Sequence, residues 1–170
     1  MGKLHRTTVT HLEMTAPPRL APAPRPVGKY ALLRAEKPPL HFYRYLYMTV
    51  GRPYVWVSRR NLPDETLAAI VHDDAVEIYV LYVNGAPVGY FELDFRNMPQ
   101  AELSFLGLVP EFTEQGLGRF LLGEAIALAW TKNPDRLIVQ TCTLDHPAAL
   151  PLYQRMGFSP YGQSLVEVEE

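Results

Sequence analysis

The most constraining segment of the chain covers residues 101–122, where an apolar strand passes through Pro110 and a short loop into Gly116-Leu117-Gly118 and a long apolar helix. Glycines let a backbone approach a bulky anion closely, and the first turn of a helix offers N–H groups without intrahelical partners. The helix dipole adds a positive end. The segment therefore predicts a phosphate cradle, although glycine pairs also occur in strand-to-helix turns for packing alone.

A second segment, residues 145–158, follows another apolar strand, and the two segments together resemble the GNAT superfamily of acyl-CoA-dependent N-acetyltransferases, in its small single-domain bacterial form. The resemblance covers about residues 81–161. It rests on Leu108-Val109-Pro110, Gly116-Leu117-Gly118, Ala149, Leu152-Tyr153 and Gly157-Phe158. Two positions depart from the family pattern: Thr113 stands where Arg or Gln is usual, and His146 stands where Asn is frequent.

The resemblance implies an α/β (α+β) fold, with a mixed, mostly antiparallel twisted sheet, a central splayed parallel strand pair and flanking helices. A chain of 170 residues suits one domain and is too short for two good cores. We expect a single domain over residues 1–170. Residues 1–29 would form an N-terminal strand and a proline-rich connector, and residues 76–161 the acyl-CoA-binding core.

Periodicity and turn residues predict the individual elements. Residues 7–14 suit an edge strand, and the prolines of residues 16–28 favour a stiff strap laid over the domain. Alternatively, this segment would be a ligand for a polyproline-binding module or would contribute to a homodimer. Gly107 suggests a bulge or the close approach of another group. Further strands are expected at residues 30–34, 76–83, 88–95, 103–109, 136–143 and 161–168, and helices at 39–50, 64–72, 116–130 and around Tyr153.

The resemblance also implies acetyl-CoA as co-substrate, and no metal is implied because His and carboxylate residues show no ligand spacing. Backbone N–H groups of Leu106, Gly107 and Leu108 would bind the thioester carbonyl and the oxyanion that develops on it. The full set of expected cofactor-binding residues is Leu106, Gly107, Leu108, Glu114, Gln115, Gly116, Leu117, Gly118, Arg119 and His146.

Two residues are expected to be catalytic. Tyr153 matches the family tyrosine that approaches the CoA sulfur, where a phenol can protonate the departing thiolate. Glu102 matches the catalytic glutamate of some relatives and would take the proton from the amine, with Glu92, His146 or water alone as alternatives. Cys142 is expected in the core, so transfer should be direct, within a ternary complex.

The acceptor is expected to be a primary amine of a small molecule, peptide or protein. The aromatic residues 42–47 are read as core, with an acceptor pocket as the alternative. Together with Trp56 they would favour an apolar amine, whereas Glu92, Asp94 and Glu102 would draw a cationic one. A fold can also keep its ligand site without the reaction, so an acyl-CoA sensor or interaction module stays open.

Composition narrows the remaining possibilities. The net charge of −2, with scattered basic residues, does not suggest nucleic acid as a partner. Apolar stretches fall short of the roughly 20 residues of a membrane span, so no membrane partner is expected. The single cysteine rules out an internal disulfide, which suits a reducing cytoplasm.

Overall fold

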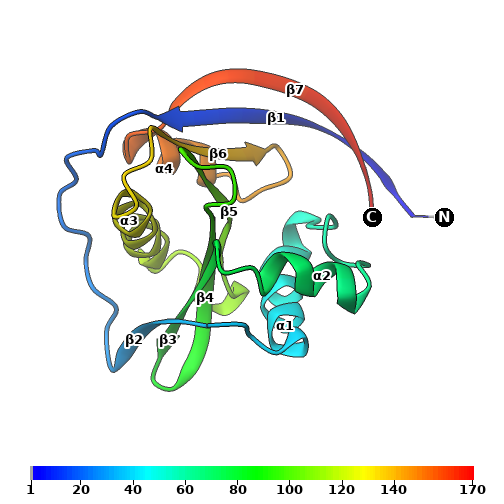
Figure 1. The fold of residues 1–170 in the computed structure, drawn as a ribbon, viewed down its shortest axis with the longest axis horizontal. Coiled ribbons are helices and arrows are strands. Elements are labelled where there is room, and N and C mark those ends of the chain that lie inside the picture. The colour runs from blue at the N-terminus through cyan, green and yellow to red at the C-terminus, as the bar shows by residue number, and fades with distance from the viewer. Residues whose placement is uncertain (1) are drawn as a thin grey trace.

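The computed structural model describes residues 2–170, which form one seven-stranded sheet in the order β2-β3-β4-β5-β6-β1-β7 (Figure 1). Every neighbouring pair is antiparallel except β5 and β6, which run parallel. The strands are β1 (Leu4–Met14), β2 (Tyr30–Arg34), β3 (Val76–Val83), β4 (Ala86–Asp94), β5 (Gln100–Leu108), β6 (Arg136–Cys142) and β7 (Ser159–Glu169). The expected fold class, a mostly antiparallel sheet with one parallel pair between helices, is confirmed.

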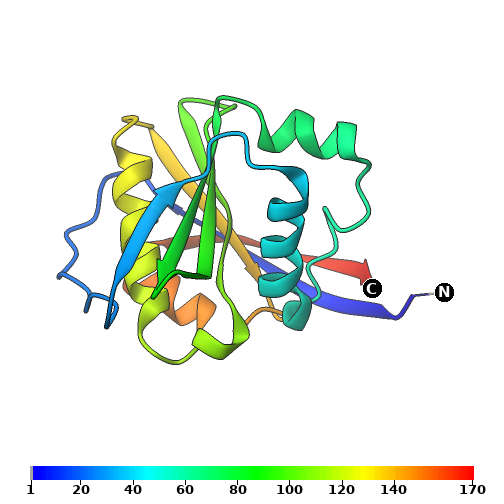
Figure 2. The same cartoon turned by 90° about the horizontal axis from the view of Figure 1, so that it is seen from below.

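Helices cover both faces of the sheet, as Figures 1 and 2 show. α3 (Leu117–Trp130) and α4 (Ala149–Arg155) lie on one face, and α1 (Leu40–Gly51) and α2 (Asp64–Val71) lie on the other. Two short 3-10 turns, η1 (Arg52–Tyr54) and η2 (Pro110–Phe112), follow α1 and β5. Each face has its own buried apolar cluster, one beneath α3 and one beneath α1.

Local sequence signals account for the main turns. Asn84 and Gly85 join β3 to β4 with φ of 51° and 87°, the left-handed pair that a two-residue hairpin favours. Gly157 follows α4 with φ of 109°, a conformation that costs glycine no Cβ clash. Pro151 falls in the first turn of α4, where its missing N–H has no intrahelical bond to lose. The hairpin, the late start of this helix and its glycine cap are all confirmed.

β1 lies inside the sheet, so its prediction as an edge strand is wrong. Residues 9–14 pair with β6, and residues 4–13 pair with β7, both antiparallel. Leu12 and Met14 are buried in the cluster beneath α3. The alternation of apolar and polar residues in this segment correctly indicates one buried face. Its partner strands β6 and β7 lie far along the chain, so no nearby residue indicates that both edges of β1 are paired. The outermost strand on this side is β7.

β1 and β7 pair over most of their length, and residues 4–8 of β1 continue past the end of β6. We call the paired residues 4–11 of β1 and 162–169 of β7 the terminal ribbon. Figure 1 shows this ribbon arching away from β6 toward the ends of the chain, over the side of the molecule that carries α1 and α2. The ribbon thereby adds a wall to the space beside the sheet.

The parallel pair is short. β5 and β6 pair only from Gln100–Arg136 to Leu103–Val139, although both strands continue beyond these residues. At the same point the register between β4 and β5 shifts, so that Glu92 faces Phe105 and Leu93 faces Leu103, which leaves Ser104 as the extra residue of a β-bulge. The bulge bends β5 away from β6 and opens the expected splay.

Gly107 does not form the bulge that it suggests, but the alternative prediction of a close approach is confirmed. A Cβ on Gly107 would collide with the side chain of Val50 in α1 and would lie 3.5 Å from the indole of Trp56. The proline-rich connector, residues 16–28, has no regular secondary structure, and Leu20 and Ala23 pack against the cluster beneath α3. At these two residues the connector lies against the domain, as expected of a strap.

The internal position of β1 generates a matched pair of variants within one strand. Leu12 is fully buried, whereas Leu4 is 59% exposed at the start of the same strand. Leu12→Ala should lower the free energy of unfolding by about 2–5 kcal/mol through the cavity that it leaves. Leu4→Ala should change it by less than about 0.5 kcal/mol. Urea unfolding followed by circular dichroism measures both, and equal effects of the two substitutions would contradict the placement of β1 in the core.

Candidate active site

One large cavity, of about 550 Å³, occupies the gap where β5 and β6 part. β5 and β6 form its sides, and the terminal ribbon contributes residues from both of its strands. The loop before α3, the start of α4 and residues 54–58, from the end of η1 onward, complete its lining. The cavity therefore reaches from the helix face of α3 and α4 through the splay to the opposite face of the sheet.

The loop before α3 has the geometry of an anion cradle. Glu114 and Gly116 adopt left-handed backbone conformations, with φ of 65° and 77°, just before the helix begins at Leu117. A Cβ on Gly118 would lie 3.8 Å from Leu152 and 3.9 Å from Leu108, in the space between the helix and β5. The unpartnered N–H groups of the first helical turn are available to an anion there.

The expected cradle residues differ in how they meet the cavity. Glu114 and Gly118 line it, as does Thr113. The Thr113 hydroxyl donates a hydrogen bond of 2.9 Å to the carbonyl of Pro110, so this side chain braces the loop where the family has a longer one. Gln115 and Arg119 are exposed beyond the lining, Leu117 is buried in the core, and Gly116 supplies the turn.

The three expected N–H donors on β5 do not all face the cleft. The N–H of Val109 donates to the carbonyl of Val88 on β4 at 2.8 Å. Because alternate residues of an antiparallel strand direct their N–H groups to the same neighbour, Gly107 also points toward β4, whereas Leu106 and Leu108 point toward the gap. The N–H groups of Leu106 and Leu108 therefore have the direction expected of donors to a carbonyl oxygen. Gly107 contributes by lacking a side chain.

Tyr153 lies in α4 and lines the cavity, although the residue is only 7% exposed. Its ring packs edge-on against Phe158, with 5.8 Å between centroids. Burial raises the pKa of Tyr153, and the nearby charge of Asp145 raises it further. The phenol therefore holds its proton firmly while its side chain borders the cavity.

His146, expected to bind the cofactor and named as an alternative base, makes two contacts within the protein. Its Nδ1 accepts a hydrogen bond of 3.0 Å from the N–H of Ala148, just before α4 begins. The ring also lies edge-on to Tyr54, at 6.1 Å between centroids, and both residues line the cavity. The histidine thus caps the turn before α4 and helps to join the two loops at the rim of the cavity.

Glu102 lies on β5 one residue before the parallel pairing ends, and it is half-buried. Burial raises the pKa of Glu102, and the charges of Asp94 and Glu92 raise it further. Its side chain shares the sheet face of Ile138 and Asp94, which carries α1 and α2. Glu102 does not line the cavity itself, so contact with an amine there requires an intervening water.

Glu92, the competing base, is engaged elsewhere. Its carboxylate is fully buried, and Arg59 Nη1 donates to both of its oxygens at 2.6 Å. The hydroxyl of Tyr43 donates to the same carboxylate at 2.8 Å. This trio connects β4, α1 and the segment after η1, so its geometry is that of a structural brace.

The segment after η1 carries an aromatic wall. Trp56 packs against Phe105 and Tyr47, with centroids 5.1 Å and 5.6 Å apart, and all three residues line the cavity. Of the aromatic residues 42–47 in α1, Tyr43 and Tyr47 are buried, and Tyr47 reaches the cavity. The interpretation as core is therefore confirmed for Tyr43, whereas Tyr47 is both buried and part of the cavity lining, and Tyr45 is 47% exposed.

Cys142 is half-buried and lines the cavity, so its expected place in the core is wrong. In β6, Leu137 and Val139 face the cluster beneath α3, and the alternation turns Cys142 to the opposite face. An apolar run does not by itself reveal which of its residues face a cleft.

The terminal ribbon is the part of the site that sequence reasoning missed. Val9, His11, Ser164 and Val166 line the cavity, and His11 Nε2 lies 2.7 Å from the hydroxyl of Ser164 across the two strands. Residues paired across strands share a face, which places these side chains on the same face as Cys142. The alternation of residue types distinguishes the two faces of each strand. No residue nearby in the sequence indicates that one of these faces borders a cavity.

Comparison with known proteins agrees with this geometry. A family model described as the Acetyltransferase (GNAT) family matches residues 40–158. The match spans more than half of the chain, and the protein therefore belongs to the GNAT family of acetyltransferases. No curated protein matches the chain. Among the residues that the structure describes, no helix has the length and apolar character needed to cross a membrane.

Several solved structures share the fold at low sequence identity. A functionally unknown conserved protein from Staphylococcus epidermidis is 18% identical, with a TM-score of 0.64 over 98% of this chain and 63% of its own. A GCN5-related N-acetyltransferase from Kribbella flavida is 15% identical, with a TM-score of 0.62 over 96% and 58%. The ribosomal-protein-S18-alanine N-acetyltransferase of Escherichia coli is 16% identical, with a TM-score of 0.63 over 83% and 94%. The chain thus spans less than two thirds of the first two proteins.

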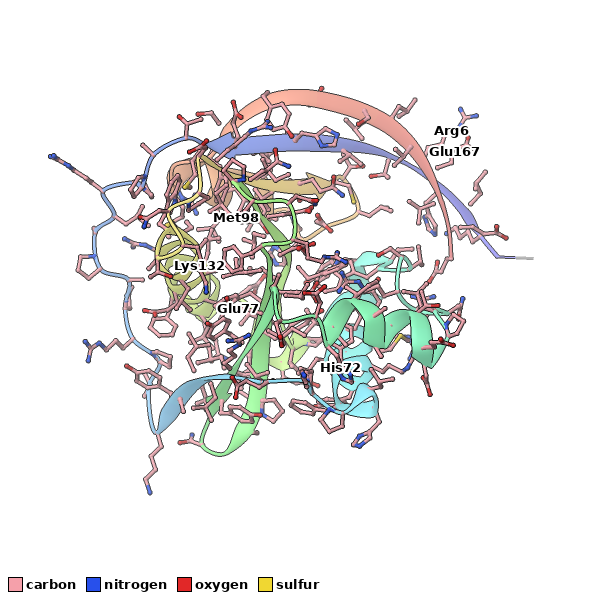
Figure 3. All side chains as sticks on the ribbon, in the orientation of Figure 1. Arg6, His72, Glu77, Met98, Lys132 and Glu167 are labelled. Atoms are coloured by element: carbon pink, nitrogen blue, oxygen red, sulfur yellow. The ribbon has the colours of Figure 1, made fainter. Side chains whose placement is uncertain are left out.

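The buried brace predicts a large cost for losing one partner. Arg59→Met would leave the Glu92 carboxylate buried without its cation and should lower the free energy of unfolding by about 3–5 kcal/mol. The double variant Arg59→Met/Glu92→Gln should recover most of that loss in urea unfolding at pH 7. Arg6→Met is the matched control, because Arg6 and Glu167 form a 3.0 Å pair at the outer side of the ribbon (Figure 3). An exposed pair contributes less than about 1 kcal/mol, and equal losses in both single variants would refute the brace.

Proposed function

We propose that the protein transfers an acetyl group from acetyl-CoA to a primary amine, by direct attack within a ternary complex. The cradle and the opposite face of the splay open into one cavity, so both substrates can be bound there together, and Cys142, although it lines that cavity, is given no acyl-carrying role in this proposal. The observation that carries the proposal is that the cradle before α3, the unpaired edge of β5 and Tyr153 all border the same cavity. Membership of the GNAT family supports acyl transfer in general. The amine belongs to a small molecule or a peptide that enters the cavity from the side of α1 and the terminal ribbon.

The residues around the cradle fit the diphosphate and pantetheine parts of acetyl-CoA. The first turn of α3 would hold the phosphates through backbone N–H groups, and Gly118 leaves the space that a Cβ would fill. Leu108 and Leu152 would border the pantetheine arm beside Gly118. When bound, acetyl-CoA supplies a thioester: the amine nitrogen bonds to the acetyl carbon, the C–S bond breaks, one proton leaves the amine and one reaches the sulfur.

The donors on β5 would polarise the carbonyl. The N–H groups of Leu106 and Leu108 point into the gap, and the bulge at Ser104 holds β6 too far away to accept from them. Fixed donors aimed at a developing oxyanion stabilise the transition state more than the ground state. In this proposal the carbonyl oxygen of the thioester accepts the hydrogen bonds that a neighbouring strand would otherwise accept.

Tyr153 would donate the proton to the departing thiolate. Its raised pKa keeps the phenol protonated at neutral pH, and the proton moves only as negative charge develops on sulfur. An acyl-CoA sensor would need the cradle alone, whereas the placement of this phenol beside the cavity favours the reaction.

Glu102 would accept the amine proton through water. Burial and the charges of Asp94 and Glu92 raise its pKa, which makes it a stronger base than an exposed glutamate. Its place on the α1 side of the sheet suits an amine that enters from that side. Water alone is the alternative acceptor, because a small fraction of any amine is neutral at pH 7.

The cradle can be tested at Gly118, where a Cβ makes only ordinary contacts. Gly118→Asp places a carboxylate beside the phosphates and should weaken the binding of CoA at least about 10-fold, or 1.4 kcal/mol. Gly118→Ala is the matched control and should stay within about threefold of the original protein. Isothermal titration with CoA measures both. If Gly118→Asp bound CoA as tightly as the alanine variant, the phosphates would not lie at this loop.

The role of Tyr153 can be tested by its phenylalanine variant. Tyr153→Phe should lower kcat for thiol release by about 100-fold while the Kd of acetyl-CoA changes less than about threefold. Tyr45→Phe, an exposed position on α1, is the control and should keep full activity. Because the pKa of Tyr153 is raised, the original protein should show no alkaline loss of kcat below about pH 9. Unchanged kcat in Tyr153→Phe would remove this residue from the mechanism.

The same assay distinguishes the two proton acceptors. Glu102 acts in its ionised form, so kcat/KM should rise with pH through a pKa above that of an ordinary glutamate. Glu102→Gln should abolish that acidic limb and lower the plateau. A pH profile that Glu102→Gln leaves unchanged would assign the proton to water.

A further inference from the structure

Apolar and aromatic side chains form much of the acceptor end of the cavity, together with the polar Thr7, His11, Ser58 and Ser164. Tyr47, Trp56 and Phe105 line it from the side of α1. Val9 and Val166 line it from the terminal ribbon, on the face of the sheet that α1 also covers. These two walls belong to the face opposite the cluster beneath α3, so they lie on the side from which an amine would enter.

The carboxylates near this end are already engaged. Glu92 is bound by Arg59, and Asp94 is bound by Arg96, whose Nη2 lies 2.8 Å from its carboxylate. Burial alone would raise the pKa of Asp94, but the hydrogen bonds and charge of Arg96 lower it. Neither carboxylate lines the cavity. Two of the three carboxylates that the sequence offers to a cationic acceptor are therefore engaged inside the protein, and the third, Glu102, is the proposed proton acceptor.

Two carboxylates remain among the described residues that line the cavity, Asp145 and Glu114. Asp145 accepts hydrogen bonds from the Thr141 hydroxyl at 2.5 Å and from the N–H of Cys142 at 2.9 Å. Glu114 belongs to the cradle loop before α3. Burial raises the pKa of Tyr54, and the charges of Asp145 and Glu114 raise it further, which places Glu114 near the rim that Tyr54 and His146 form. Asp145 is therefore engaged within the protein, and Glu114 belongs to the loop proposed to hold CoA.

The aromatic wall is held by its packing, and its rings are inclined at 49° to 78° to one another, so a planar group can meet them by face or by edge. The indole of Trp56 lies against Gly51 and Gly107, two positions where a Cβ would meet it or its neighbour Val50. Phe105 packs on Trp56 on one side, and the guanidinium of Arg59 lies 4.7 Å from the centroid of its ring. The N–H of Arg59 also donates to the Tyr47 hydroxyl at 3.2 Å. A wall fixed in this way suits a planar group without the entropy cost of ordering it.

We propose that the acceptor is a singly charged primary amine carried on an apolar, planar group, an arylalkylamine in chemical class. The inference rests on the proposed acetyl transfer and defines the substrate of that site. The planar group would pack between the aromatic wall and the valines of the terminal ribbon. A polyamine or an aminoglycoside would bring extra ammonium groups against the apolar rings and valines of this end, where Glu92 and Asp94 are already paired, which is costly.

A thiol-release assay with saturating acetyl-CoA tests the class. The acceptors are 2-phenylethylamine and tryptamine on one side, and spermidine and kanamycin on the other. We expect kcat/KM for the arylalkylamines to exceed that for the two polycations by at least about 10-fold. Higher kcat/KM for spermidine or kanamycin would overturn the acceptor class while the transferase itself stood. Tight acetyl-CoA binding without turnover of any amine would instead refute the transferase, and the inference with it.

A pair of variants on one strand locates the pocket. Val166 faces the cavity, whereas its neighbour Leu165 is 74% exposed on the opposite face of the ribbon. Val166→Asp should raise the KM for 2-phenylethylamine at least about 10-fold and lower the KM for spermidine, with kcat little changed. Leu165→Asp should leave both KM values within about twofold. Equal effects of the two variants would overturn the placement of the acceptor against the ribbon, and titration with CoA monitors the integrity of each protein.

Discussion

The early end of the parallel ladder between β5 and β6 is the constraint on which the rest of this structure depends. Two strands that pair over only four residues leave backbone N–H groups of β5 without a strand partner. Buried amide groups without partners are costly, so such an opening persists only beside water or a ligand. The bulge at Ser104 creates the opening, and α3, α4 and the terminal ribbon surround it. The site is a gap in a sheet whose donors remain available to a carbonyl oxygen.

The acceptor side is held by packing and by one buried ion pair. Arg59 extends from an irregular segment to reach Glu92 on β4, and Tyr43 of α1 joins the same carboxylate. These bonds fix a stretch of chain that has little regular hydrogen bonding of its own, and Trp56 lies within it. Gly51 and Gly107 complete the arrangement by leaving room for the indole and for Val50. The buried ion pair between Arg59 and Glu92 therefore helps to fix the position of the apolar wall that contains Trp56.

Much of the fold and part of the site could be predicted because their signals are local. The hairpin at Asn84-Gly85, the cradle before α3 and the short helix of Tyr153 are each specified by residues close in sequence. The position of β1, the bulge at Ser104 and the engagement of Glu92 by Arg59 depend on partners far along the chain. Alternation shows that a strand has two different faces, but not what each face meets. The lining by Cys142 and by the ribbon was missed for this reason.

The position of β1 also determines when the site can form. β1 is made first, yet its neighbours β6 and β7 are made last, and both contribute to the cavity wall. Pairings between distant parts of a chain form slowly, because the long intervening loop must close first. During synthesis, the helices α1 and α2 and the β2-β3-β4 meander can assemble while β1 still lacks both partners. The cavity is therefore among the last features to mature, so ribosome-bound chains without β6 and β7 would be folded in part and would lack a complete cavity wall.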